Sequence, residues 1–169
     1  QLASELGQSV RLWVDNLQSF HHMCPALDPA LAAQDIGGVN VRRWSSVLPV
    51  VVPADIVIEG FGAPLPVSYV NAMAARSPRP VWINLEYLSA ESWVDGCHGL
   101  PSPQARLPLV KYFFFPGFTP ATGGLLMESG LARTREAFQN DADAVARFWH
   151  TLGVVSAAGA TPRVSLFCY

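Results

Sequence analysis

The sequence predicts an α/β protein built on a Rossmann-like, mostly parallel sheet with helices on both faces. Short apolar runs of strand length alternate with segments whose apolar residues recur at helical spacing. The runs are apolar at consecutive positions, which is typical of parallel strands buried on both faces. The composition, 50% hydrophobic and 14% charged, is that of a folded domain.

The expected strands are rich in β-branched and aromatic residues and are bounded by Gly, Pro, Asp or Asn. They are residues 9–14, 39–44, 55–59, 80–85, 109–115 and 163–169. The Gly37-Gly38 pair is expected to turn the chain into the second of these strands.

The expected helices are defined by their caps and their apolar spacing. Residues 2–6 have the pattern of a last helical turn that ends at Gly7. Asp28 followed by Pro29 predicts an N-cap and a short helix over 28–34. Further helices are expected at residues 66–76, 89–96 and 131–152, the last with a break near 140–141.

The order of the elements predicts how the chain is divided. Residues 1–155 are expected to form one domain, 156–162 a linker, and 163–169 the first strand of a second domain. In a doubly wound sheet the first strand lies between the second and the fourth. The elements here begin after that strand, so we expect the strands at Val10 and Ile56 to have unpaired edges. A regular Rossmann sheet is then expected only when that position is filled.

Several classes of function do not fit the sequence. The formal charge of −2 offers no basic surface for nucleic acid. No apolar run approaches the ~18 residues that a membrane span requires. The three cysteines lack CxxC spacing, which favours a reducing cytoplasm. The adjacent pairs Cys97-His98 and His21-His22 have no second cluster beside them, which argues against a metal site. GxGxxG and phosphate-loop motifs are absent from the sequence, which argues against NAD enzymes and phosphate-loop NTPases.

Polar residues after the 80–85 strand are the sharpest candidates for a binding site. In open parallel sheets, ligands bind beyond the carboxyl ends of the strands. Asn84, Glu86 and Tyr87 stand at such an end. An amide and a carboxylate two positions apart can hold a guanidinium group or sugar hydroxyls by charge-assisted hydrogen bonds. Alternatively, Glu86 caps the next helix and Asn84 satisfies a loop backbone.

Two further strand ends carry candidate residues. Gly117 and Thr119 belong to a proline- and glycine-rich segment that could wrap a ligand with backbone N–H groups, or could be a simple turn. Glu59 ends the 55–59 strand, where it is either a hydrogen-bond acceptor for a loop or a catalytic base.

Several blocks of sequence together resemble one family. The segments at residues 81–91, 96–103, 111–119, 122–126 and 164–169, the last reading Val-Ser-Leu-Phe-Cys-Tyr, are similar to the EarP family. Its members are protein-arginine rhamnosyltransferases that act on translation elongation factor P. The resemblance covers nearly the whole chain.

The resemblance implies the GT-B fold, in which two Rossmann-like domains face one another across a cleft. It implies transfer of L-rhamnose from dTDP-β-L-rhamnose to an arginine side chain, with inversion, without a metal and without a cofactor. This chain would be the amino-terminal, acceptor-side domain without its first strand, and it is expected to be inactive alone. Phe167 and Tyr169 match aromatic residues of the family's donor site.

No catalytic residue is assigned within the chain. The family's general base is an aspartate in an Asp-Asn-Phe-Gly-Asp type loop, which is expected upstream of Gln1, and Asp15-Asn16 is not that motif. Two other readings stay open, namely a module that only docks elongation factor P and a GT-B transferase with a small-molecule acceptor.

Overall fold

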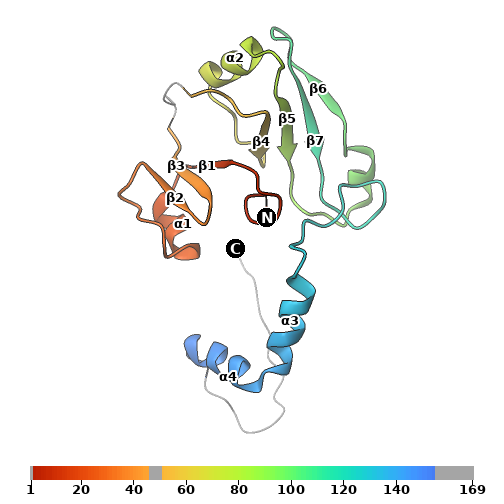
Figure 1. Ribbon diagram of the computed structural model, residues 1–169. Coiled ribbons are helices and arrows are strands. Elements are labelled where there is room, and N and C mark those ends of the chain that lie inside the picture. Colours follow the sequence, from red (N-terminus) through yellow and green to blue (C-terminus); the bar gives the residue numbers. More distant parts are fainter. Residues whose placement is uncertain (1, 46–50, 155–169) are drawn as a thin grey trace. The chain divides into compact units, whose positions relative to one another are not determined.

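The computed structural model describes residues 2–45 and 51–154 of the chain (Figure 1). It divides into two compact units, Gln1–Leu126 and Met127–Tyr169. The first unit holds two sheets, one of three strands and one of four.

The three-stranded sheet has the order β1-β3-β2. Strand β1 (Val10–Val14) runs parallel to β3 (Val39–Arg43), whereas β2 (Ala33–Ile36) is antiparallel to β3. Gly37 and Gly38 join β2 to β3 with φ values of 56° and 80°, the left-handed pair that a two-residue hairpin requires. Helix α1 (Leu17–Met23) packs on this sheet through a small core of Leu17, Leu27 and Val41.

The prediction of a helix over residues 28–34 is wrong. The Asp28 carboxylate accepts a hydrogen bond from the Ala30 N–H at 2.8 Å, and the Gln34 amide bonds to both backbone groups of Asp28. These local side-chain bonds make a turn, because they offer the backbone an alternative to helical bonding. The helix lies earlier, at α1, where the Asn16 side chain accepts from the Ser19 N–H at 2.9 Å and acts as the N-cap.

The four-stranded sheet has the order β4-β5-β7-β6. Strands β4 (Ile56–Gly60), β5 (Val81–Leu85) and β7 (Val110–Phe114) are parallel, and the short β6 (Pro101–Pro103) is antiparallel to β7. The parallel strands therefore bring their carboxyl ends to one edge of the sheet, as the sequence predicts.

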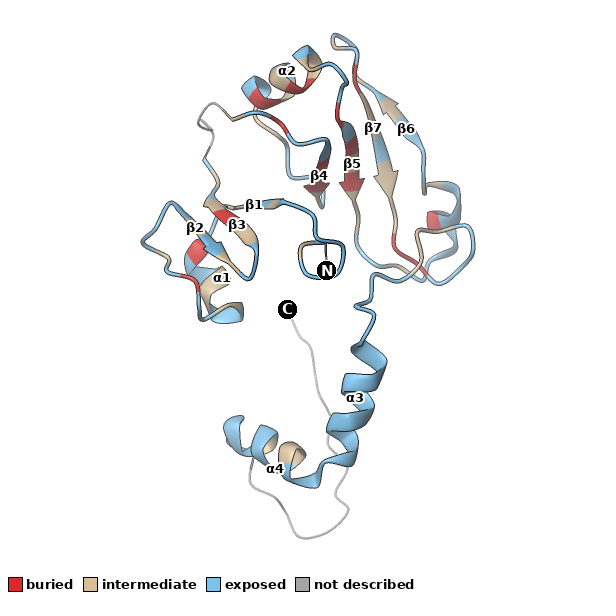
Figure 2. Ribbon diagram, in the orientation of Figure 1, coloured by how far each residue is buried: buried red, intermediate tan, exposed pale blue. Residues whose placement is uncertain are grey.

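Helix α2 (Val67–Ala75) connects β4 to β5 and covers one face of this sheet. Figure 2 shows buried segments on α2 and on the strands β4 and β5. One core cluster contains the buried residues Val57, Tyr69, Met73, Trp82 and Leu109. Side chains alternate along each strand, so residues such as Ile56, Ile58 and Tyr112 belong to the other face, where they are exposed.

The described strands form two sheets, whereas a regular Rossmann sheet is expected only when the position of the first strand is filled. Strands β1 and β4 each lie at the edge of their own sheet, as expected for Val10 and Ile56. The architecture is α/β with parallel pairing, which is compatible with a Rossmann-like domain. Of the helix expected at 89–96, only the short 3-10 helix η1 (Ser92–Gly96) forms.

The second unit contains the helices α3 (Leu131–Asn140) and α4 (Ala142–Thr151), so the predicted break near 140–141 is confirmed. The Asp141 carboxylate caps α4 by accepting from the Ala144 N–H at 2.9 Å. The predicted linker and final strand lie outside the described residues. Among the helices that the structure describes, none has the length and apolar character to cross a membrane.

Candidate functional site

The loops that follow β5 and β7 lie side by side at the carboxyl edge of the four-stranded sheet. The Glu86 N–H donates to the Phe114 carbonyl at 2.9 Å, and the Ser89 N–H donates to the Pro116 carbonyl at 3.3 Å. Ser89 also forms a parallel bridge with Gly117. The structure thus brings together two groups of residues that the sequence places about 30 positions apart.

Asn84 is the most unusual polar residue at this edge. It is 1% exposed, and its Nδ2 donates to the Glu86 Oε1 at 2.5 Å. Its Oδ1 is buried and has no hydrogen-bond partner among the described residues. A buried acceptor without a partner costs about 1–3 kcal/mol, so this oxygen has an unused capacity to accept a hydrogen bond. Glu86 does not cap η1, whose N-cap is Glu91.

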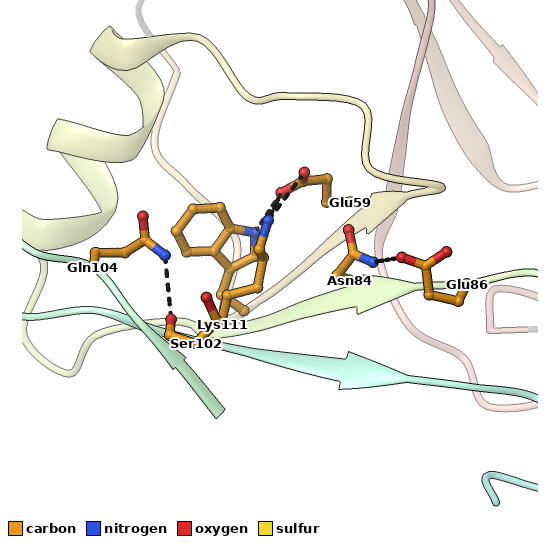
Figure 3. A network of polar contacts seen from close by, with 7 residues as sticks. Glu59, Asn84, Glu86, Ser102, Gln104 and Lys111 are labelled. Atoms are coloured by element: carbon orange, nitrogen blue, oxygen red, sulfur yellow. Dashed lines mark hydrogen bonds and ion pairs between the residues drawn. The ribbon is translucent and has the colours of Figure 1, made fainter. Parts of the chain in front are cut away.

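A partly buried ion pair lies beside Asn84 (Figure 3). Glu59 is the register partner of Asn84 and is only 4% exposed. Its carboxylate accepts from the Trp82 Nε1 at 3.2 Å and from the Lys111 Nζ at 3.3 Å. Sequence reasoning placed Glu59 at a strand end but missed Lys111, although both are charged residues within apolar runs. Glu59 is therefore engaged with strand side chains and not with a loop.

Tyr87 belongs to an exposed aromatic pair. Its ring stacks on that of Phe61 with centroids 4.1 Å apart and an interplanar angle of 15°. Tyr87 is 67% exposed and Phe61 54% exposed. Sequence reasoning missed Phe61, whose signal is a bulky residue between Gly60, which ends β4, and Gly62.

Gly117 and Thr119 shape the loop after β7. The Gly117 N–H donates to the Gly124 carbonyl at 3.1 Å, so this N–H already has a partner within the loop. A Cβ at Gly117 would lie 2.6 Å from the Thr122 Cγ2, so the close approach requires glycine. The Thr119 hydroxyl donates to the Asp95 carboxylate at 2.7 Å and thereby ties this loop to η1.

A cavity of about 150 Å³ lies between this loop and η1. Its walls carry hydroxyl groups, two carboxylates and one exposed aromatic ring; the lining residues are Ser89, Ala90, Glu91, Ser92, Val94, Asp95, Phe118, Thr119 and Thr122. Thr119 therefore lies in the wall of a polar cavity beside the strand ends.

A family model described as "Elongation-Factor P (EF-P) rhamnosyltransferase EarP" matches residues 1–169. The chain belongs to the EarP family. It is 53% identical to a protein-arginine rhamnosyltransferase of Pseudomonas putida and 48% identical to one of Pseudomonas aeruginosa, each over 169 residues. One from Shewanella oneidensis is 42% identical over 175 residues. Each alignment covers 100% of this chain and 44% of the relative.

Two of the blocks that resemble the EarP family contribute residues to the edge described above. The block at 81–91 supplies β5 and the loop with Asn84, Glu86 and Tyr87, and the block at 111–119 supplies β7 with Gly117 and Thr119. Phe167 and Tyr169 lie outside the described residues, so their expected place in a donor site stays a prediction.

Charge decides what this edge can hold. Residues 80–105 contain Glu86, Glu91 and Asp95 but no Lys or Arg, and residues 112–132 also contain no Lys or Arg. Together with the Asn84 Oδ1, these side chains supply hydrogen-bond acceptors and negative charge. Such a set suits a cationic donor such as a guanidinium group.

Proposed function

We propose that this chain forms the acceptor-side domain of a GT-B glycosyltransferase that moves L-rhamnose from dTDP-β-L-rhamnose to an arginine of translation elongation factor P. The match of the family model to residues 1–169 carries this proposal. Because the chain spans 44% of the length of its curated relatives, the activity is proposed for the complete enzyme. The complete enzyme is proposed to act in the cytoplasm and to use a protein as its acceptor.

The strand-end chemistry supports a role in holding the acceptor. Arginine stays protonated near neutral pH, so the enzyme must orient a delocalised cation before the bond forms. The Asn84 Oδ1 and the Glu86 carboxylate are two acceptors joined by the bond between the Asn84 Nδ2 and the Glu86 Oε1. We propose that these two acceptors accept hydrogen bonds from the guanidinium N–H groups of the acceptor arginine.

The proposed reaction is a single displacement with inversion and needs no metal or cofactor. A guanidinium nitrogen forms a bond to the anomeric carbon of rhamnose while the bond from that carbon to the diphosphate oxygen breaks. The nitrogen loses one proton to a general base, and dTDP leaves with the bonding electron pair. Asn84 and Glu86 orient the nitrogen, and Phe167 and Tyr169 are proposed to contact the donor nucleotide.

A substitution in the complete enzyme tests the assignment. Glu86→Gln keeps the shape and removes the charge, so we expect kcat/KM for elongation factor P to fall about ten- to hundred-fold. Glu136→Gln, on the exposed surface of α3, is the matched control and should be neutral. The product is followed by mass spectrometry as one deoxyhexose on an arginine. Unchanged rates for Glu86→Gln would remove this residue from the acceptor site.

Measurements of elongation factor P binding and of rhamnose transfer distinguish the two alternatives, a docking module and a transferase with a small-molecule acceptor. Binding of elongation factor P without any transfer of rhamnose by the complete enzyme would favour a docking module. Transfer to a small molecule and not to the protein would favour a different GT-B acceptor. The acidic strand-end loops support a cationic protein side chain over a neutral small molecule.

A further inference from the structure

We infer that the stacked rings of Phe61 and Tyr87, called here the aromatic platform, bind the flat face of the acceptor guanidinium group. The inference rests on the proposed function and names the feature that recognises arginine. Planar guanidinium cations stack on aromatic rings and are held there by the negative charge of the ring face.

The platform stands at the carboxyl ends of two neighbouring parallel strands. The Phe61 N–H donates to the Leu85 carbonyl at 2.7 Å, so the chain leaves β4 and β5 side by side. Stacking leaves Phe61 54% and Tyr87 67% exposed, so much of each residue faces solvent. Tyr87 directly follows Glu86, the carboxylate bonded to Asn84. The aromatic platform and the hydrogen-bond acceptors of Asn84 and Glu86 thus come from the residues after β4 and around the end of β5.

The backbone at Phe61 is held in an unfavourable conformation. Its φ of 55° lies in the left-handed region, which a bulky residue seldom adopts. Conformations of this kind cost about 1–3 kcal/mol and gather at ligand-binding sites. Phe61 is 54% exposed, so burial of this residue offsets the cost only in part. A binding role explains why Phe, and not Gly, occupies the position between Gly60 and Gly62.

Charge identifies the ligand class. A nucleotide base or a sugar could also stack on aromatic rings, but the donor carries a diphosphate. The loop after β5 carries Glu86, Glu91 and Asp95, and residues 80–105 contain no Lys or Arg that would attract phosphate. A cation is favoured at this place and an anion is disfavoured. The platform therefore belongs to the arginine and not to the nucleotide.

Binding of arginine methyl ester to the whole protein, labelled with ¹³C in its tyrosine rings, tests the inference without requiring turnover. The Tyr87→Phe variant identifies the Tyr87 signal by its disappearance. We expect arginine methyl ester to shift this signal in a saturable way, and lysine methyl ester and dTDP to shift it less. Phe61→Leu should weaken arginine binding about two- to five-fold. Phe138→Leu, at an exposed phenylalanine of α3, should leave it unchanged.

Three results would overturn the platform, namely no saturable shift with arginine, an equal response to lysine, or a stronger response to dTDP. In turnover, the Tyr87→Leu variant should raise KM for the acceptor protein about two- to five-fold, and Tyr87→Phe should restore it. An enzyme that binds arginine here but transfers no rhamnose would refute the proposed function alone. An active enzyme whose Tyr87→Leu variant keeps the same KM would refute the platform alone.

Discussion

Glu59 and Lys111 place opposite charges inside the four-stranded sheet. They stand on β4 and β7, which are separated by β5, and they meet because the Lys111 side chain passes over the Trp82 ring of β5. The Lys111 Nζ is 5.1 Å from the centroid of the Trp82 ring and 3.3 Å from the Glu59 carboxylate. The pair links strands that share no backbone hydrogen bonds, and it does so beside Asn84.

Removing one member of this pair should be costly. In Lys111→Met, the buried Glu59 carboxylate keeps only the Trp82 N–H, and we expect a loss of about 2–4 kcal/mol in the free energy of unfolding. The double variant with Glu59→Gln should recover part of that loss, because it removes the unpaired charge. Urea denaturation measures both. Asp55→Asn is the control: Asp55 pairs with Arg76 but its side chain is 89% exposed, and its loss should cost under ~1 kcal/mol.

Asn84 should separate stability from activity. Its buried Oδ1 lacks a partner among the described residues, so Asn84→Leu removes an unfavourable acceptor together with the bond to Glu86. We expect the free energy of unfolding to change by less than ~1 kcal/mol. The kcat/KM for the acceptor protein should nevertheless fall at least ten-fold in the complete enzyme. A large loss of stability would instead make Asn84 a structural residue.

The parallel strands were predictable from the sequence because each is a short apolar run, and β4, β5 and β7 lie close to their expected bounds. Helix α1 was missed because Asp15-Asn16 also fits the end of a strand, and β6 because its Pro-Ser-Pro sequence has little strand propensity. The position of Asn84 and Glu86 at the sheet edge was predictable, because ligands bind beyond the carboxyl ends of parallel strands. The pairing of Lys111 with Glu59 was not predictable, because it depends on the register of three strands.

The loop after β7 depends on a close approach at Gly123. A Cβ there would overlap the Phe114 ring and the His98 side chain, which belong to β7 and to the chain before β6. Gly123→Ala should therefore lower the free energy of unfolding by about 1–3 kcal/mol, as read from thermal or urea unfolding. Gly96→Ala is the matched control, since no atom lies within 4 Å of its added Cβ. An equal free energy of unfolding for the two variants would show that the loop accommodates the added Cβ at Gly123 without a loss of stability.

At the scale of the whole first unit, β1 and β4 each end a sheet, and no further described strand pairs with their outer edges. The Arg11 guanidinium donates to the Val52 carbonyl at 3.3 Å, and Trp13 and Trp44 pack against the core of the four-stranded sheet. A strand paired with both β1 and β4 would join the sheets in the order that a doubly wound fold requires. That completed sheet stays a prediction, and it would place one more strand end beside that of β4.

The same open edge predicts self-association. On β4, Ile56 is 58% and Ile58 46% exposed, and an apolar edge strand pairs readily with other chains. We expect this chain to form oligomers as its concentration rises, measured by sedimentation equilibrium. Ile58→Lys should shift the distribution towards monomer, because a charged side chain disfavours pairing at an edge. Val67→Lys, a change at a 76% exposed position on α2, should behave as the unaltered chain does. A chain that stays monomeric at all concentrations would show that the β4 edge is already protected.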